Sequence, residues 1–271
     1  MQREYRHLRE AITRAGRKAL EMSAKGFDVY EKTDRSPVTT ADLEVNRILH
    51  DMQQKEFPDD GWLSEESPDD QARLGKTRVW IVDPIDGTRA YMNRLPEFSI
   101  SVALVQNAVP VVGAVFVPST DELFTAVRHE GLRLNEKEIV PTPLHTTLPL
   151  VAVSPGELKR GRWADLDGHV QFRPMLSIAN ALAMVAACRV HAALTIEPQN
   201  EWDLGAGALL IEEGGGFITD STGQPLSFNQ ATPRFPGVFA VSALADATLR
   251  SRLQATADGA RSRISRAKPR S

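Results

Sequence analysis

The chain has 271 residues, 42% of them hydrophobic and 25% charged, which is enough for one large domain or two ordinary ones with a substantial core. The net charge of -3 at neutral pH argues against a nucleic-acid polymer or an anionic membrane as the main partner. The single cysteine, Cys188, excludes a disulfide framework and a cysteine-rich metal site, and its apolar surroundings favour a packed small residue.

The first half of the chain predicts two helices followed by a sheet. Apolar residues at helical spacing predict a first helix that ends at Gly26, and a second helical pattern starts at Asp42 and stops at Pro58. Short turns then separate apolar runs, which favours consecutive antiparallel strands at VWIVD, FSISVALV, PVVGAVFVP and ELFTAVR. We therefore expect a meandering sheet with both helices packed on one face.

The second half predicts alternating strands and helices. Strands are expected at LVAVSP, HAALTIE and VFAVSA, helices at SIANALAMVAACRV and EWDLGAGALLIEEGG, and a hairpin at FITDSTGQPLSF. The pattern relaxes around residues 135–150, so we expect an N-terminal α+β half over residues 1–140 and a C-terminal α/β half over residues 141–260. The basic residues 261–271 are expected to form a disordered tail.

The chain has none of the patterns expected for export or membrane insertion. Its first residues, MQREYRHLREAI, are charged and lack the apolar stretch of a signal peptide. No apolar run approaches the roughly 18 residues that a membrane span needs. We therefore expect a soluble cytoplasmic protein without a membrane partner.

The segment WIVDPIDGTRAY presents two acids around a proline after a buried strand. Because Pro84 has no N–H for a sheet ladder, the strand should stop at or near Asp83, with Asp86 beyond a tight turn. The two carboxylates and the carbonyl of Ile85 would then form an oxygen-rich pocket that suits Mg²⁺.

Each acidic motif also has an ordinary structural interpretation. Asp-Pro and Asp-Gly pairs are common turn formers. Asp42 and Asp203 each stand where a helix begins, and aspartate is a favourable N-cap. A functional interpretation therefore depends on the combination of the motifs.

Taken together, WIVDPIDGT, SEES upstream of it and EWDLGAGALLIEEGG downstream resemble the inositol monophosphatase superfamily, in order and spacing, over nearly the whole chain. The resemblance implies a layered α-β-α-β-α sandwich of the inositol monophosphatase and fructose-1,6-bisphosphatase type. It also implies a Mg²⁺-dependent phosphoric monoester hydrolase with two or three ions per active site and sensitivity to lithium. The expected partner is a small phosphorylated metabolite, and a homodimer is left open.

The resemblance also assigns metal ligands. They are Glu65, Asp83, the main-chain carbonyl of Ile85, Asp86 and Asp203. Asp83 would bridge two ions. Glu65 and the Ile85 carbonyl would complete the first site, and Glu65 would reach a third ion through water. Asp86 and Asp203 would complete the second site.

Other matching residues would act on the substrate and the water. Thr88 would orient the attacking water, Glu65 would help to take its proton, and Asp42 would support Thr88. Lys32 is a looser match to a lysine of the N-terminal loop. From the residues themselves, the amides of Gly87 and Thr88 would cradle the phosphate if they open a helix.

Phosphate-ester chemistry explains these residue types. A phosphate monoester repels nucleophiles, and two divalent ions about 3.5–4 Å apart can activate water and neutralise the leaving oxygen. Oxygen ligands are sufficient for Mg²⁺. The resembled enzymes form no phospho-enzyme, in keeping with the lack of an obvious His or Cys nucleophile in this sequence.

The sequence indicates the substrate less clearly than it indicates the superfamily. The stretches DRSPVTTAD and EWD resemble the 3′(2′),5′-bisphosphate nucleotidase branch, which converts 3′-phosphoadenosine 5′-phosphate to AMP and phosphate. DGTRAY departs from that branch, and DGTRA also occurs in histidinol-phosphate phosphatases. The alternatives are therefore an inositol-1-monophosphatase, a histidinol-phosphate phosphatase, or a non-enzyme homologue that binds metal or phosphate without catalysis.

Two residues are candidates for recognising the leaving group of the substrate, which determines selectivity. Glu201 stands just before Asp203, and its ordinary interpretation is a solvated acid that favours the helix N-terminus. Arg89 follows the proposed phosphate-binding turn and could contact a second phosphate, or it could be an ordinary surface charge.

Overall fold

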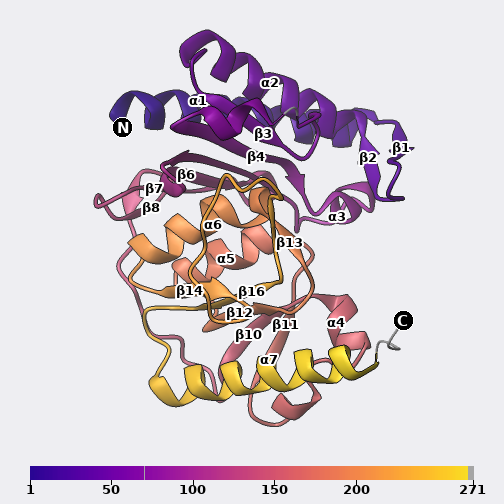
Figure 1. The fold of residues 1–271 in the computed structure, drawn as a ribbon, viewed down its shortest axis with the longest axis vertical. Helices are drawn as coiled ribbons and strands as arrows, with labels where there is room; N and C mark the ends of the chain where they lie inside the picture. Colours follow the sequence, from indigo (N-terminus) through magenta and orange to yellow (C-terminus); the bar gives the residue numbers. More distant parts are fainter. Residues whose placement is uncertain (70, 268–271) are drawn as a thin grey trace.

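Two large β-sheets and three groups of helices alternate in the structure, a computed structural model that describes residues 1–69 and 71–267 (Figure 1). The α-helices are α1 (Gln2–Lys25), α2 (Thr40–Glu56), α3 (Thr88–Met92), α4 (Pro155–Lys159), α5 (Ile178–Ala186), α6 (Glu201–Glu213) and α7 (Ala247–Ala267). Short 3₁₀ turns occur at η1 (Ala72–Gly75), η2 (Pro118–Thr120) and η3 (Ala164–Leu166). In the described part of the chain, no helix is long and apolar enough to cross a membrane.

The N-terminal sheet has the order β3-β4-β5-β6-β7-β8-β9 and is antiparallel except for the β3–β4 pair. Its strands are β3 (Gly61–Ser64), β4 (Arg78–Asp86), β5 (Ser99–Gln106), β6 (Val109–Val117), β7 (Glu122–Val127), β8 (Leu132–Leu134) and β9 (Lys137–Glu138). Helices α1 and α2 cover one face (Figure 1). The predicted meander with two helices on one face is thus confirmed.

The second large sheet has the order β11-β10-β12-β16-β14 and mixes parallel and antiparallel pairs. Its strands are β10 (Leu150–Val153), β11 (Gln171–Pro174), β12 (Ala192–Thr195), β14 (Phe217–Asp220) and β16 (Val238–Val241). Two small ladders pair β1 (Val29–Glu31) with β2 (Pro37–Thr39), and β13 (Gln199–Asn200) with β15 (Arg234–Phe235). The layers follow the order helices, sheet, helices, sheet, helix (Figure 1), so the expected α-β-α-β-α sandwich is confirmed.

Strand β4 is apolar because both of its faces are buried. Trp80 and Val82 pack in the cluster formed with α1 and α2. Val79 and Ile81 point to the other side, into the cluster that contains α5 and α6. Successive side chains of a strand alternate between faces, so a strand between two helical layers needs apolar residues at every position.

The sequence predicted that the strand would stop at or near Asp83, but β4 continues to Asp86. Its pairing with β5 shifts from Asp83 opposite Ser101 to Asp86 opposite Ser99, so β4 holds one extra residue there. Such a bulge accommodates Pro84, which cannot donate to the ladder. The bulge separates the two aspartates while keeping both on the same strand.

Helix α6 lies between the two sheets and is buried almost all round, as expected for a helix covered on every side. It approaches α5 closely at Gly207, where a Cβ atom would lie only 2.5 Å from Cδ1 of Leu182. A glycine at this crossing therefore sets the distance between the two helices that reach the candidate site.

Two predictions for the C-terminal part were wrong. The segment after β14 turns through bonds that the Asp220 carboxylate accepts from the backbone at Thr222 and Gln224, and no second hairpin strand forms there. Residues 261–267 belong to α7, which packs through Leu253 and Ala257 on the second sheet, and are helical rather than disordered. The expected disorder of residues 268–271 lies outside the described residues.

We predict that Gly207→Ala lowers the free energy of unfolding by about 1–3 kcal/mol, because an added methyl must push Leu182 out of a packed contact. Urea denaturation followed by circular dichroism measures this. Gly75→Ala is the matched control, since no atom lies within 4 Å of the added Cβ. Equal stability of the two variants would contradict the proposed tight α5–α6 crossing.

Candidate active site

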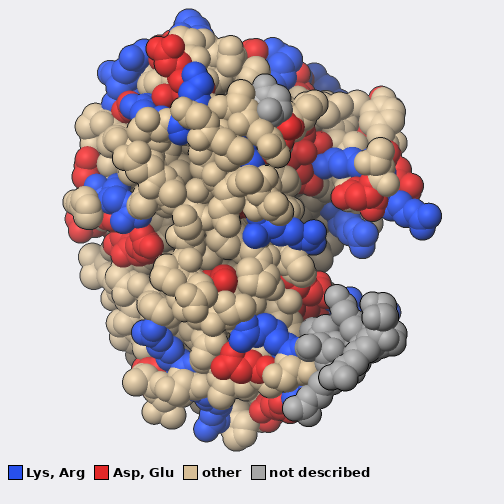
Figure 2. Space-filling model, viewed as in Figure 1, with Lys and Arg blue, Asp and Glu red and all other residues tan. Residues whose placement is uncertain are grey.

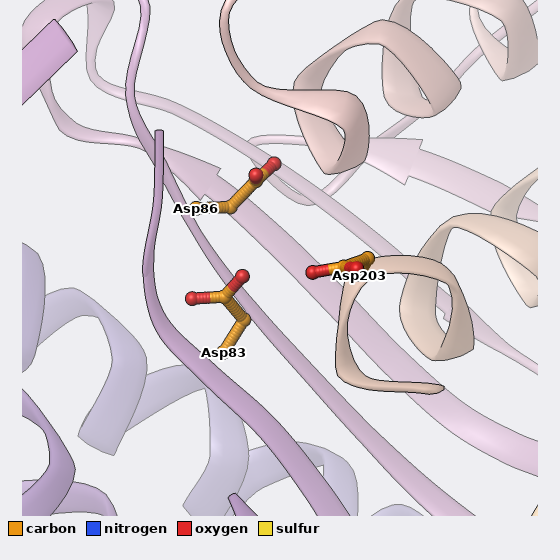
Figure 3. A group of neighbouring side chains, drawn as sticks. All are labelled: Asp83, Asp86 and Asp203. Carbon is orange, nitrogen blue, oxygen red and sulfur yellow. The ribbon is translucent and has the colours of Figure 1, made fainter. Parts of the chain in front are cut away.

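Three carboxylates converge at the end of β4 (Figure 3). Ligand oxygens of Asp83, Asp86 and Asp203 all lie within 4.8 Å of one another. Asp83 and Asp86 come from the two sides of the bulge, and Asp203 comes from the first turn of α6. The structure therefore brings together three of the five predicted metal ligands from both halves of the chain.

Hydrogen bonds orient the carboxylates of Asp86 and Asp203. Oδ2 of Asp86 accepts from the Ser177 hydroxyl and, at 2.6 Å, from the Ala179 N–H at the start of α5. Oδ2 of Asp203 accepts from the Asn200 N–H at 2.6 Å. Asn200 is thus the N-cap of α6, and Asp203 is its capping-box partner rather than the cap itself.

The cluster carries a high concentration of buried negative charge. Burial, then the charges of Glu65, Asp86 and Asp203, raise the pKa of Asp83 well above its ordinary value. Burial raises the pKa of Asp86 to about 6, against the lowering effect of its hydrogen bonds with Ser177 and the start of α5. Burial and neighbouring carboxylates also raise the pKa of Asp203. A cation at this point would offset the repulsion.

The donor atoms fit a hard divalent cation. Asp83 is 1% exposed, and its Oδ1 is buried without a hydrogen-bond partner among the described residues. An unpaired buried carboxylate oxygen is costly, and coordination to a cation removes that cost. Carboxylate oxygens are the ligands that Mg²⁺ prefers, so this donor set suits the expected metal.

Glu65 stands beside the cluster but is paired with a lysine. Nζ of Lys32, just after β1, lies 2.9 Å from Oε1 of Glu65 and 2.6 Å from Oε1 of Glu66. The Glu66 side chain is 4% exposed, and burial raises its pKa to about 7. Lys32 thus belongs to the site, and Glu66 is a neighbour that the sequence did not single out.

Thr88 contacts Asp42, its predicted partner, and also the carbonyl of Ile85. Its Oγ1 lies 3.3 Å from Oδ1 of Asp42 and 3.2 Å from the carbonyl oxygen of Ile85. The other Asp42 oxygen accepts from the Thr39 N–H at 2.8 Å. Thr39 is the N-cap of α2, because its hydroxyl oxygen accepts from the N–H groups of Ala41 and Asp42. Asp42 is therefore not the cap that its position suggested, and its free oxygen faces Thr88.

Gly87 connects β4 to α3. Its φ of +92° lies in the left-handed region, and a Cβ atom would lie 3.2 Å from the carbonyl oxygens of Glu97 and Leu176. Both the backbone angle and the close approach require glycine. The turn places Thr88 at the start of α3.

A cleft of about 510 Å³ opens beside the cluster and is lined by residues from both halves. Asp86 and Asp203 lie in its wall together with Arg89 from α3. The remaining lining includes Ser154, Gly156, Arg160, Leu176, Ser177, Thr195, Glu197 and Gln199. Figure 2 shows the side of the molecule near α3 and α4 hollowed between the two halves, with acidic and basic side chains at its edge.

Glu201 does not line this cleft, contrary to its expected role in substrate selection. It is fully buried, and its carboxylate accepts the N–H groups of Asn229 at 2.7 Å and Gln230 at 2.8 Å. Its ordinary interpretation as a solvated acid is wrong as well. The side chain instead ties the start of α6 to the loop before β15, while Asp203, two residues on, reaches the cluster.

Sequence reasoning missed several polar residues of the site. Ser177 had a local signal, since a serine directly before the helical run IANALA is a typical N-cap. Arg160 and Glu197 had none, because they follow α4 and β12 in irregular segments and meet only in the folded chain.

Comparisons with known proteins agree with this geometry. A model of the inositol monophosphatase family matches residues 1–257. The chain is 33% identical over 230 residues to Nus factor SuhB of Pasteurella multocida, covering 78% of this chain and 84% of that protein. It is 30% identical over 218 residues to the 3′(2′),5′-bisphosphate nucleotidase CysQ of Escherichia coli K12, covering 78% and 85%.

Solved structures show the same fold. A Thermotoga maritima IMPase superposes with a TM-score of 0.82 at 25% identity, covering 97% of this chain and 100% of that one. The suppressor protein SuhB of Bartonella henselae gives a TM-score of 0.79 at 26% identity, covering 93% and 97%. The fold and the acidic site define a phosphatase of the inositol monophosphatase type. The chain belongs to the inositol monophosphatase family.

We predict that Asp83→Asn stabilises the metal-free protein at pH 7.5 by about 1–3 kcal/mol, because the change removes one of several repelling buried charges. Urea denaturation in EDTA measures the change. Mg²⁺ should then raise the melting temperature of the wild type more than that of the variant.

The exposed residue Asp59 provides a matched control, since Asp59→Asn makes the same chemical change outside the cluster. This control should alter neither the stability in EDTA nor the response to Mg²⁺. A loss of stability in Asp83→Asn without metal would show that the charges of the cluster do not repel as described.

Proposed function

We propose that the protein is a Mg²⁺-dependent phosphoric monoester hydrolase that releases phosphate from a small phosphorylated metabolite. The observation that carries this proposal is the convergence of Asp83, Asp86 and Asp203 beside a cleft, next to the Thr88–Asp42 contact. Acids that meet in this way repel one another and destabilise the metal-free fold, so the bonds of Asp86 and Asp203 to the helix starts do not by themselves account for the cluster.

The proposed metal ligands are the three converging aspartates, Glu65 and the carbonyl of Ile85. When bound, Mg²⁺ neutralises phosphate oxygens and lowers the pKa of a bound water. Glu65 would exchange its ion pair with Lys32 for the cation, and Lys32 would keep its partner Glu66. In the structure, the ion pair with Lys32 holds Glu65 near the cluster.

Thr88 and Asp42 are proposed to handle the attacking water. Thr88 has a single hydroxyl proton, and Asp42 offers it a carboxylate oxygen. A hydroxyl that donates to Asp42 keeps its lone pairs free to accept from water, which turns the water's own lone pair towards the phosphorus. Glu65 is the proposed proton acceptor, as the resemblance implies.

Direct attack by water also agrees with the cleft lining. Its described residues include no His or Cys, and the hydroxyl of Ser177 is committed to Asp86. We propose that the amides of Gly87 and Thr88 bind the phosphate. A homodimer remains a prediction.

As substrate we propose a 3′(2′),5′-bisphosphate nucleotide such as 3′-phosphoadenosine 5′-phosphate. Support comes from DRSPVTTAD and EWD, and from relatives named 3′(2′),5′-bisphosphate nucleotidase. Arg89, which lines the cleft, is the proposed contact for a second phosphate. The inositol monophosphatase family model, which matches residues 1–257, keeps inositol 1-phosphate as the second candidate; histidinol phosphate and a non-catalytic role are the further alternatives.

The decisive experiment compares phosphate release from 3′-phosphoadenosine 5′-phosphate, inositol 1-phosphate and histidinol phosphate. We expect turnover with Mg²⁺, no turnover in EDTA, inhibition by Li⁺ and the highest kcat/KM for the bisphosphate. Full activity after dialysis against EDTA would rule out the metal mechanism. If the protein binds Mg²⁺ but releases phosphate from none of the three substrates, the non-catalytic alternative is favoured.

Asp86→Asn should lower kcat by several orders of magnitude on every substrate, because it removes a proposed metal ligand with little change in volume. The fold should survive, as checked by circular dichroism. Asp59→Asn should keep wild-type turnover. Near-normal activity of Asp86→Asn at saturating Mg²⁺ would remove Asp86 from the proposed ligand set.

A further inference from the structure

An arginine and a glutamate form an ion pair in the wall of the cleft, apart from the acidic cluster. A guanidinium nitrogen of Arg160, which follows α4, contacts Oε1 of Glu197, which follows β12. Both side chains remain accessible, at 46% and 43% exposure. The proposed function uses neither residue.

Buried contacts fix the backbone on both sides of this pair. Glu157 of α4 is fully buried, and its Oε1 accepts from the Ile196 N–H at 2.9 Å and from the Thr195 hydroxyl at 3.1 Å. The same hydroxyl oxygen accepts from the Glu197 N–H at 3.1 Å. Helix α4 is therefore attached to the end of β12, and the pair has a defined place.

The Arg160 guanidinium lies against the first turn of α4. A Cβ atom on Gly156 would lie 3.1 Å from Nη2 and 3.3 Å from Nη1 of Arg160. The absence of a side chain at position 156 thus leaves room for the guanidinium beside the cleft wall, where both residues belong to the lining.

Arg160 is paired with one acid of the cleft lining, Glu197. Asp86 and Asp203 are committed to the acidic cluster, and Arg89 makes no ion pair with a described residue. Glu197 is thus the acid that neutralises Arg160. A phosphate beside the cluster would leave the rest of the substrate to extend along the cleft.

We infer that Arg160 forms a subsite for a second anionic group on the leaving part of the substrate, with Glu197 as the competing internal anion. The inference rests on the proposed function and extends it to small bisphosphorylated substrates. A guanidinium binds phosphate through two parallel N–H bonds, so the second phosphate takes the place of Glu197 on Arg160. A monophosphate has no second phosphate to displace Glu197, so the Arg160–Glu197 ion pair stays formed.

This arrangement predicts opposite effects for the two partners. Arg160→Gln should lower kcat/KM for a bisphosphate about 10–100-fold, as expected for the loss of a charged hydrogen bond. It should change kcat/KM for a monophosphate by less than about threefold. Glu197→Gln frees the guanidinium and should raise kcat/KM for the bisphosphate about 3–10-fold.

The test compares kcat/KM within two substrate pairs. One pair is 3′-phosphoadenosine 5′-phosphate and adenosine 3′-phosphate, and the other is inositol 1,4-bisphosphate and inositol 1-phosphate. The control variants are Arg47→Gln and Glu44→Gln, which break an exposed Arg–Glu pair on α2 outside the cleft. These control variants should leave the ratio of kcat/KM between bisphosphate and monophosphate unchanged in both substrate pairs.

The outcomes separate the two proposals. If Arg160→Gln slows all substrates equally, or none, the subsite is wrong even when the wild type hydrolyses the nucleotide. If the wild type does not hydrolyse the nucleotide but prefers inositol 1,4-bisphosphate, and Arg160→Gln removes that preference, the nucleotidase assignment fails and the subsite stands. A fall in bisphosphate turnover in Glu197→Gln would also overturn the competing-anion role.

Discussion

The repulsion among Asp83, Asp86 and Asp203 is the constraint around which the rest of the structure is arranged. Three carboxylates with oxygens within 4.8 Å of one another would separate or become protonated in a flexible protein. Here they are held by a bulged strand between helical layers and by a helix buried on every side. The stability of the surrounding cores keeps together groups that disfavour the metal-free fold.

The capping interactions of α5 and α6 connect this constraint to the local sequence. Each helix start supplies an N–H to one carboxylate oxygen, so the helix termini are satisfied and the acids are oriented by the same bonds. Structural capping and metal binding are therefore compatible roles for one aspartate. Asp203 is not the N-cap that its position suggested: its Oδ2 accepts from the Asn200 N–H as part of the capping box, while the residue also belongs to the acidic cluster.

Features set by residues close together in the sequence could be predicted, and features set by contacts between distant residues could not. The apolar strand pattern and the motif around Asp83 are local, so the meander and the end of β4 where the acids gather could be predicted. The bulge at Pro84 was missed because a strand can continue past a proline at an irregular position. Glu201 was misplaced because its partners, the Asn229 and Gln230 amides, are distant in the sequence. Helix α7 was missed because few apolar residues anchor it.

The position of α6 between the sheets has a consequence for the synthesis of the chain. Asp83 and Asp86 leave the ribosome long before Asp203, and α6 cannot be buried until strands on both of its sides are present. A nascent chain that contains only the first sheet therefore carries an incomplete acidic pocket. The affinity of the proposed site for a divalent ion should therefore arise late in biosynthesis, once α6 is in place between the sheets.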